Sequence, residues 1–143
     1  MLRIVPVDQE TLAEWQSIHN VIIPTGTLTL HQVAERARRH RLTLAYDDGH
    51  LIGNGTVRPP VGDDGSATVI VRVLPAFRRL GRGTEYLQLL LADARTFAPD
   101  SIRTIVLASN VEGLAFATLR GFVEVDRYVL TGDDVPYVEL QLP

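Results

Sequence analysis

The sequence contains neither cysteine nor lysine, and all fourteen of its basic residues are arginine. Without cysteine, the chain cannot form a disulfide framework, use a thiol nucleophile, carry an acyl-cysteine intermediate or build a cysteine-type zinc site. Any thiol that takes part in its chemistry must therefore belong to a ligand. We interpret the absence of lysine as coding bias, because arginine also serves the ordinary surface roles of lysine.

Long apolar segments are also missing. No apolar run approaches the roughly 20 residues of a membrane-spanning helix, and residues 1–6 lack the regions of a signal peptide. The net charge of −3 and the isoelectric point near 5.8 give no general attraction to nucleic acid or to an anionic membrane. We therefore expect a cytoplasmic protein with neither nucleic acid nor membrane as a partner.

The composition, 45% hydrophobic and 22% charged, is that of an ordinary globular protein, and 143 residues predict one domain spanning 1–143. Strands and helices are expected in mixed order. This order predicts the α/β (α+β) class, with a mixed sheet flanked by about four helices. The expected helices cover 10–21, a stretch from about 29, a stretch from 83, and 111–120; the expected strands cover 2–7, 42–46, 51–58, 67–74, 102–108, 122–130 and 135–142.

Residues 78–84 lie between a β-branched strand and a long amphipathic helix, so their backbone N–H groups converge on a helix N-terminus, which attracts anions. Gly81 and Gly83 permit positive φ and close approach of a ligand. Arg78, Arg79 and Arg82 would surround a bound diphosphate. The alternative is an ordinary strand-to-helix turn, and neither the P-loop nor the three-glycine dinucleotide turn fits this spacing.

Just before this segment, residues 71–75 read Val-Arg-Val-Leu-Pro, and Arg78, Gly81 and Gly83 follow in the spacing Arg-x-x-Gly-x-Gly. This arrangement resembles motif A of the GNAT N-acetyltransferase superfamily. The resemblance implies the GNAT fold, in which the sheet is mainly antiparallel and two central parallel strands splay apart. It also implies acetyl-CoA as the co-substrate.

A second motif of the family is matched by Asn110, Phe116 and the pair Gly121 and Phe122, so the resemblance covers about residues 66–125. It implies that strand backbone groups hold the pantetheine arm and that loop amides hold the diphosphate. Asn110 would approach the cysteamine end, or serve only as a helix N-cap. The implied cofactor-binding residues are Val71, Val73, Arg78, Arg79, Gly81, Arg82, Gly83, Thr84 and Asn110.

The implied reaction is direct attack of a primary amine, on a small molecule or a protein, within a ternary complex. Many family members place a tyrosine directly after the Phe116 position as general acid, but this sequence has Ala117 there. Tyr128, or Ser109 with a water, is the substitute we consider. Alternatively, Tyr128 is a sheet-surface aromatic and the thiolate leaves without enzymatic protonation.

A general base is less evident, because the strand at 67–74 carries no carboxylate. Glu124 and Asp126 alternate with valines, so both are expected on one face of a strand. Glu124 is the candidate base, and a solvent-facing role is the alternative. His19, followed by Asn20, is a candidate for lining the acceptor cleft, with a buried structural histidine as the alternative.

The acceptor cleft is expected between the first two helices, the turn at 59–66 and the last hairpin, where Asp133 and Asp134 would attract a cationic amine. No metal is assigned, because the remaining histidines have no metal-ligand spacing. Exposed final strands also allow a homodimer. The alternative functions are a non-catalytic acyl-CoA sensor, which Ala117 favours, and a protein-interaction domain that uses the arginine-rich second helix.

Overall fold

The computed structural model describes residues 1–78 and 80–143 and confirms the predicted order of strands and helices, with one short 3₁₀ helix added. Helices and strands end within a few residues of the predicted bounds. The elements are β1 (Leu2–Pro6), α1 (Leu12–Ile22), α2 (Leu30–Arg39), β2 (Arg41–Asp47), β3 (His50–Arg58), β4 (Ser66–Val73), η1 (Pro75–Phe77), α3 (Arg82–Arg95), β5 (Ser101–Leu107), α4 (Val111–Leu119), β6 (Val123–Tyr128) and β7 (Tyr137–Gln141).

The strands form one seven-stranded sheet in the order β1-β2-β3-β4-β5-β7-β6. Only β4 and β5 are parallel; all other neighbours are antiparallel. The predicted fold class, a mainly antiparallel mixed sheet with a central parallel pair and four α-helices, is therefore confirmed. No helix in the described part of the chain has the length and apolar character needed to cross a bilayer.

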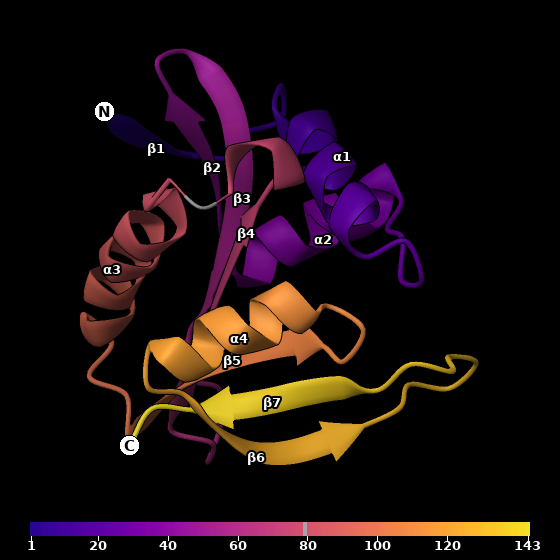
Figure 1. The fold of residues 1–143 in the computed structure, drawn as a ribbon, viewed down its shortest axis with the longest axis vertical. Helices are drawn as coiled ribbons and strands as arrows, with labels where there is room; N and C mark the ends of the chain where they lie inside the picture. Colours follow the sequence, from indigo (N-terminus) through magenta and orange to yellow (C-terminus); the bar gives the residue numbers. More distant parts are fainter. Residues whose placement is uncertain (79) are drawn as a thin grey trace.

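Helices cover both faces of the sheet. Figure 1 shows α1 and α2 on one side of β3 and β4, and α3 on the other side. Two apolar clusters correspond to these layers. The larger lies under α3 and α4 and includes Tyr86, Leu90 and Phe122, whereas the smaller joins Trp15 and Val33 to β2.

Helix α1 is fixed to the middle of β3 by reciprocal hydrogen bonds. The indole Nε1 of the fully buried Trp15 donates to the Gly55 carbonyl at 3.2 Å, and the Asn54 Nδ2 donates to the Trp15 carbonyl at 3.0 Å. Replacing a buried tryptophan by alanine costs roughly 3–5 kcal/mol of stability. A buried indole N–H also needs a hydrogen-bond partner, which Gly55 supplies here. The position of α1 against β3 is thus set by both packing and hydrogen bonding.

Helix α2 begins with a capping box. The Thr29 hydroxyl accepts a hydrogen bond from the Gln32 backbone N–H at 3.1 Å, and the Gln32 side chain accepts one from the Thr29 N–H at 2.8 Å. This pair satisfies two N–H groups that the helix end would leave free. It fixes the start of α2 at Leu30, as the sequence pattern indicates.

The expectation that Glu124 and Asp126 share one face of their strand is wrong. A bulge shifts the register of β6 against β7, so that Glu124 lies opposite Leu140 and Asp126 lies opposite Glu139. Because Leu140 and Glu139 are consecutive, they lie on opposite faces, and so do their partners. The alternation of polar and apolar residues in the sequence does not indicate where a bulge occurs. For this reason the pattern predicted the wrong faces for these two side chains.

His19 is a buried neutral group in α1, with only 3% of its surface exposed. Its ring stacks on Trp15, and its Nε2 lies 2.9 Å from the Gly26 carbonyl, which can only accept, so Nε2 carries the proton. Burial, with a smaller contribution from Arg72, lowers the pKa of His19 to about 4. His40 is similar, since burial and then Arg58 lower its pKa to about 4.

Acidification should therefore destabilise the fold. Between pH 6.5 and 4 the unfolded chain binds a proton at His19 that the folded chain rejects, so stability falls as pH falls. From pH 7 to pH 5 this costs about 2 kcal/mol for such a histidine. We expect His19→Gln to reduce that loss by about the same amount in urea unfolding at the two pH values, whereas the exposed His31→Gln leaves it unchanged. An identical loss in the wild type and His19→Gln would contradict the assignment.

Candidate functional site

The central feature of the site is a gap between two parallel strands. β4 and β5 pair only from Ser66 and Ser101 to Thr68 and Arg103, and no further pairing between them follows among the described residues. Both strands continue beyond that point, to Val73 and Leu107. The sheet is therefore open through its middle from this point onward.

Backbone N–H groups of β4 face this gap. The Leu74 N–H donates to the Ile52 carbonyl on the β3 side at 2.7 Å. Because successive residues of a strand direct their N–H groups to opposite sides, the N–H groups of Val71 and Val73 point toward β5 instead. They are available to a ligand that lies along the gap.

A cleft of about 470 Å³ runs from this gap to the start of α3. Its walls come from the end of β4, the first turn of α3 and one side of α4. The lining residues are Ile22, Val71, Arg72, Val73, Arg78, Gly81, Gly83, Thr84, Asn110, Glu112, Gly113, Ala115, Phe116, Leu119 and Arg120.

At one end of the cleft, α3 begins without a side-chain cap. Gly81 is the N-cap residue with φ 78° and ψ 0°, a left-handed conformation that favours glycine. The first-turn N–H groups of α3 therefore have no capping side chain, and they carry the positive end of the helix dipole. Gly83 and Thr84, in that first turn, line the cleft. A helix start of this kind can attract an anion. The predicted contribution of Arg79 lies outside the described residues.

Two of the predicted arginines hold the framework of this end. The Arg78 Nε donates to the Val73 carbonyl at 2.8 Å, and its Nη1 donates to Glu112 of α4 at 2.9 Å. The Arg82 Nε donates to Asp47 of β2 at 2.6 Å and lowers the pKa of that carboxyl group. The Arg82 side chain is thus directed to β2 and is not among the cleft-lining groups, so its contribution to a diphosphate site would be its backbone N–H.

Asn110 is the N-cap of α4, and its place in the cleft is compatible with the second role predicted for it. Its Oδ1 accepts the Gly113 N–H at 3.0 Å as the N-cap of α4, and the residue also lines the cleft at the mouth of the gap. A smaller cavity of about 60 Å³ adjoins the cleft within the gap, lined among others by Ile23, Ile70 and Thr104. Arg72 borders both spaces.

Comparison with known proteins identifies the fold. Residues 8–122 match the model of the acetyltransferase (GNAT) family. The chain belongs to the GNAT acetyltransferase family. No curated protein sequence matches it.

Solved structures agree with this GNAT fold. A structure assigned as a phosphinothricin N-acetyltransferase is 20% identical with a TM-score of 0.83, and the match covers 99% of this chain and 98% of that one. YncA from Salmonella typhimurium, solved with its cofactor acetyl-CoA, is 18% identical with a TM-score of 0.76, over 99% and 92%. The ribosomal-protein-S18-alanine N-acetyltransferase from Escherichia coli is 20% identical with a TM-score of 0.77, over 100% and 94%.

The predicted catalytic side chains of this acetyltransferase do not lie together. Tyr128, at the end of β6, is half-buried and stacks on Tyr137 with 5.9 Å between ring centroids; burial, then Glu139, raises its pKa. Ser109 is exposed and lies outside the cleft lining. Glu124 is exposed on the edge strand and binds Arg127 at 2.9 Å, which lowers the pKa of its carboxyl group.

His19 and Asn20 do not line the cleft; their side chains hold the loop between α1 and α2. Asn20 closes the loop between α1 and α2, since its Oδ1 accepts the Leu28 N–H at 2.8 Å and its Nδ2 donates to the Leu28 carbonyl at 3.2 Å. His19 binds Gly26 in the same loop. Among the described residues, no group of three or more histidine, aspartate or glutamate side chains is placed to hold a metal ion.

Sequence reasoning missed Arg72 and Tyr137. Arg72 interrupts an otherwise apolar, β-branched strand, and a charge at such a position is a signal of function that could have been used. Tyr137 carries no comparable signal, because its place beside Tyr128 depends on the pairing of β6 with β7.

Binding of coenzyme A should depend on the conformation at Gly81. We expect Gly81→Asp to weaken acetyl-CoA binding by about 100-fold or more, because the carboxylate stands where the diphosphate is predicted. Gly132→Asp is the matched control: both glycines have positive φ and open space at the Cβ position, so the backbone strain is similar. Isothermal titration calorimetry measures both, and equal affinities would remove the proposed anion end.

Proposed function

We propose that this acetyltransferase moves an acetyl group from acetyl-CoA to a primary amine of a small molecule or protein by direct attack in a ternary complex. The observation that supports this most is the open gap between β4 and β5, which leads from unpaired backbone N–H groups on β4 to the uncapped start of α3. An extended thioester with a diphosphate at its far end has the shape and charge that this cleft complements.

Residues along the cleft support binding of the diphosphate and of the pantetheine arm. The first-turn amides of α3 would take the diphosphate, while Val71 and Val73 would hydrogen-bond the pantetheine arm across the gap. Phe116 and Gly113 give the cleft an α4 wall. Arg78 would keep that wall in place, because it ties the end of β4 to Glu112 of α4.

In the proposed reaction, the nitrogen lone pair of a neutral amine attacks the thioester carbonyl carbon, the carbon–sulfur bond breaks and the amine nitrogen loses a proton. A β4 N–H facing the gap would stabilise the oxyanion that develops, a contribution of about 3 kcal/mol in other acyl-transfer enzymes. The leaving thiolate takes a proton. Tyr128 is our candidate donor, because a phenol hydroxyl is protonated near neutral pH and burial raises its pKa further.

A non-catalytic acyl-CoA sensor is the second candidate. Ala117 stands at the position of the usual family acid, is only 3% exposed and borders the smaller cavity. Glu124, the predicted base, binds Arg127 instead of lining the cleft. Such a chain would bind acetyl-CoA through the same groups without turning it over.

Binding and turnover together separate these functions. We expect acetyl-CoA to bind in a calorimetric titration and to release free thiol only when an amine acceptor is added, because the thioester lies in a ternary complex. A panel should include amino acids, polyamines and peptides with free N-termini. Binding without release from any acceptor would establish the sensor, and absence of binding would refute the cleft assignment.

The role of Tyr128 can be tested with a conservative change. We expect Tyr128→Phe to lower kcat by about 100-fold while the KM for acetyl-CoA stays constant, since the change removes only the proton donor. Tyr46→Phe, on β2 beneath the Arg3 guanidinium, is the control and should retain full activity. An unchanged kcat for Tyr128→Phe would mean that the thiolate leaves without this acid.

A further inference from the structure

Two arginines on neighbouring strands face the layer under α1 and α2. The Asn54 side chain binds α1 through the Trp15 carbonyl, so the alternate residues of β3, among them Arg58, face the same helices. Arg72 lies directly opposite Asn54 in the β3–β4 register. Directly opposite residues share a face, so the Arg58 and Arg72 side chains enter one layer.

A third arginine reaches this layer from the helix side. Val33 is the fully buried residue of α2, and Arg36 follows it by three residues, on the same face of the helix. Arg36 is half-buried, whereas its neighbours Arg38 and Arg39 are exposed and bind Glu35. Arg36, Arg58 and Arg72, here called the arginine cluster, thus come from three different elements.

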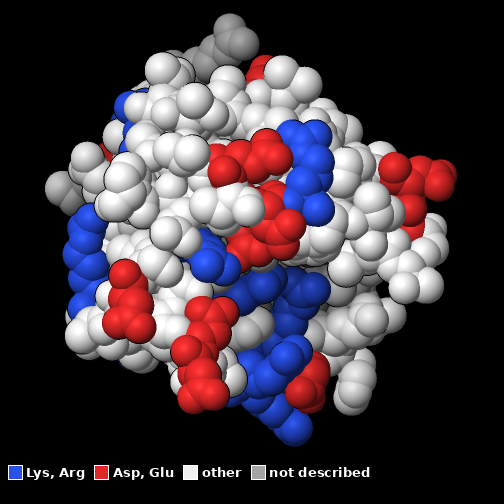
Figure 2. Space-filling model, turned by 90° about the horizontal axis from the view of Figure 1, so that it is seen from below, with Lys and Arg blue, Asp and Glu red and all other residues white. Residues whose placement is uncertain are grey.

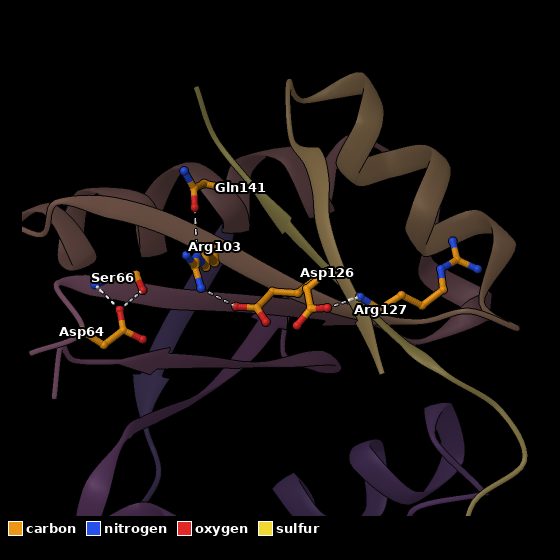
Figure 3. A network of polar contacts seen from close by, with 7 residues as sticks. Asp64, Ser66, Arg103, Asp126, Arg127 and Gln141 are labelled. Carbon is orange, nitrogen blue, oxygen red and sulfur yellow. Dashed lines mark hydrogen bonds and ion pairs between the residues drawn. The ribbon is translucent and has the colours of Figure 1, made fainter. Parts of the chain in front are cut away.

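No carboxylate in the described part of the chain forms an ion pair with the arginine cluster; Glu139, whose charge acts on Arg58 from a distance, is paired with Arg103. In the described part of the chain, its three side chains make no ion pair and no hydrogen bond, and the Arg58 Nε is buried without a partner. Other arginines do have partners: Arg41 binds Asp93, for example, and Arg103 binds Glu139 at 3.0 Å. Figure 3 shows that Arg103 also donates a hydrogen bond to Gln141. On the face of the molecule drawn in Figure 2, basic and acidic side chains lie next to one another.

Electrostatics agrees with this geometry. Burial, then Arg36 and Arg58, lowers the pKa of Arg72 to about 10, so the three guanidinium groups repel one another. Burial also lowers the pKa of Arg36 and of Arg58. Half-buried cations without a counter-ion destabilise a fold, and a bound oxyanion would offset that cost.

The arginine cluster adjoins the proposed site of acetyl transfer. Arg72 borders both the cleft and the smaller cavity in the gap. On the β7 side, the Tyr137 hydroxyl lies 2.8 Å from the position that a Cβ atom at Gly26 would take, and Tyr128 stacks on Tyr137. The surroundings of the arginine cluster thus include β3, β4, helix α2, the loop between α1 and α2 at Gly26, and Tyr137 with Tyr128 stacked on it.

We infer that the acceptor of this acetyltransferase carries a carboxylate or similar oxyanion close to its primary amine, and that the arginine cluster binds that oxyanion. Guanidinium groups match the planar geometry of a carboxylate with paired N–H donors. An acceptor held in this way would place its amine beside Arg72, at the mouth of the gap. This inference rests on the proposed acetyl transfer and adds the class of acceptor.

Matched acceptors test the inference. Free thiol release from acetyl-CoA would be measured with each of the twenty protein amino acids and with its carboxamide, which keeps the amine and side chain but removes the negative charge. For the amino acids that are the best acceptors, we expect a KM roughly 10- to 100-fold lower than that of the corresponding carboxamide. Carboxamides or polyamines that equal or exceed the acids as acceptors would overturn the inference.

Variants assign the effect to the arginine cluster. Arg36→Gln and Arg58→Gln should each raise the KM for the acid acceptor much more than for its amide, while acetyl-CoA affinity stays near that of the wild type. Arg72→Gln should raise the KM for the acid in the same selective way, but Arg72 also lines the acetyl-CoA cleft, so its acetyl-CoA affinity does not serve as the control. The exposed and unpaired Arg95→Gln of α3 is the control and should preserve the preference. If all three cluster variants keep the wild-type preference for acids, the cluster does not bind the oxyanion.

A measurement without turnover separates this inference from the proposed function. Succinate should raise the thermal stability of the wild type more than chloride does at equal ionic strength, and Arg72→Gln should remove the difference. If this effect is present but no acceptor releases thiol, the proposed transfer fails and the oxyanion is a regulator. If neither succinate nor an acid acceptor is preferred, the inference fails even when acetyl transfer to other amines is observed.

Discussion

Backbone N–H and C=O groups inside a protein must find partners, and a sheet normally supplies them from the neighbouring strand. Between β4 and β5 this supply stops after the pairing of Thr68 with Arg103. The strands continue, but their facing backbone groups have no partner strand beyond this point. This early end of the pairing opens the gap. The cleft, the smaller cavity and the exposed β4 amides all depend on it.

The two faces of the sheet differ in what they offer at that opening. On the side of α3 and α4, glycine at an uncapped helix start and an aromatic wall form an elongated site with positive potential at one end. On the side of α1 and α2, a capping box and the closed loop at Asn20 hold helices against the sheet. Half-buried arginines without counter-ions gather there, so the two sites that we propose share Arg72 at their junction.

Much of this organisation could be predicted from the sequence. The turn at Gly81, the cap at Asn110 and the interruption of β4 by Pro75 are local events, and the structure contains each of them where the pattern indicates. The faces of Glu124 and Asp126 were predicted wrongly, because a bulge is determined by how β6 meets β7 and not by β6 alone. The Arg82 side chain binds Asp47, a residue 35 positions away, which local sequence patterns do not indicate.

The sequence by itself determined the order of elements, the glycine-dependent start of α3 and the family resemblance, because each depends on residues within a few positions of one another. It also contained every member of the arginine cluster, without any indication that they meet. Tertiary structure decided that meeting, since Arg58 and Arg72 enter one layer only when β3 pairs with β4, and Arg36 joins them only when α2 buries its Val33 face. The same holds for the stacking of Tyr128 on Tyr137 and for the gap itself, because strand pairing and helix packing join residues that local patterns cannot relate.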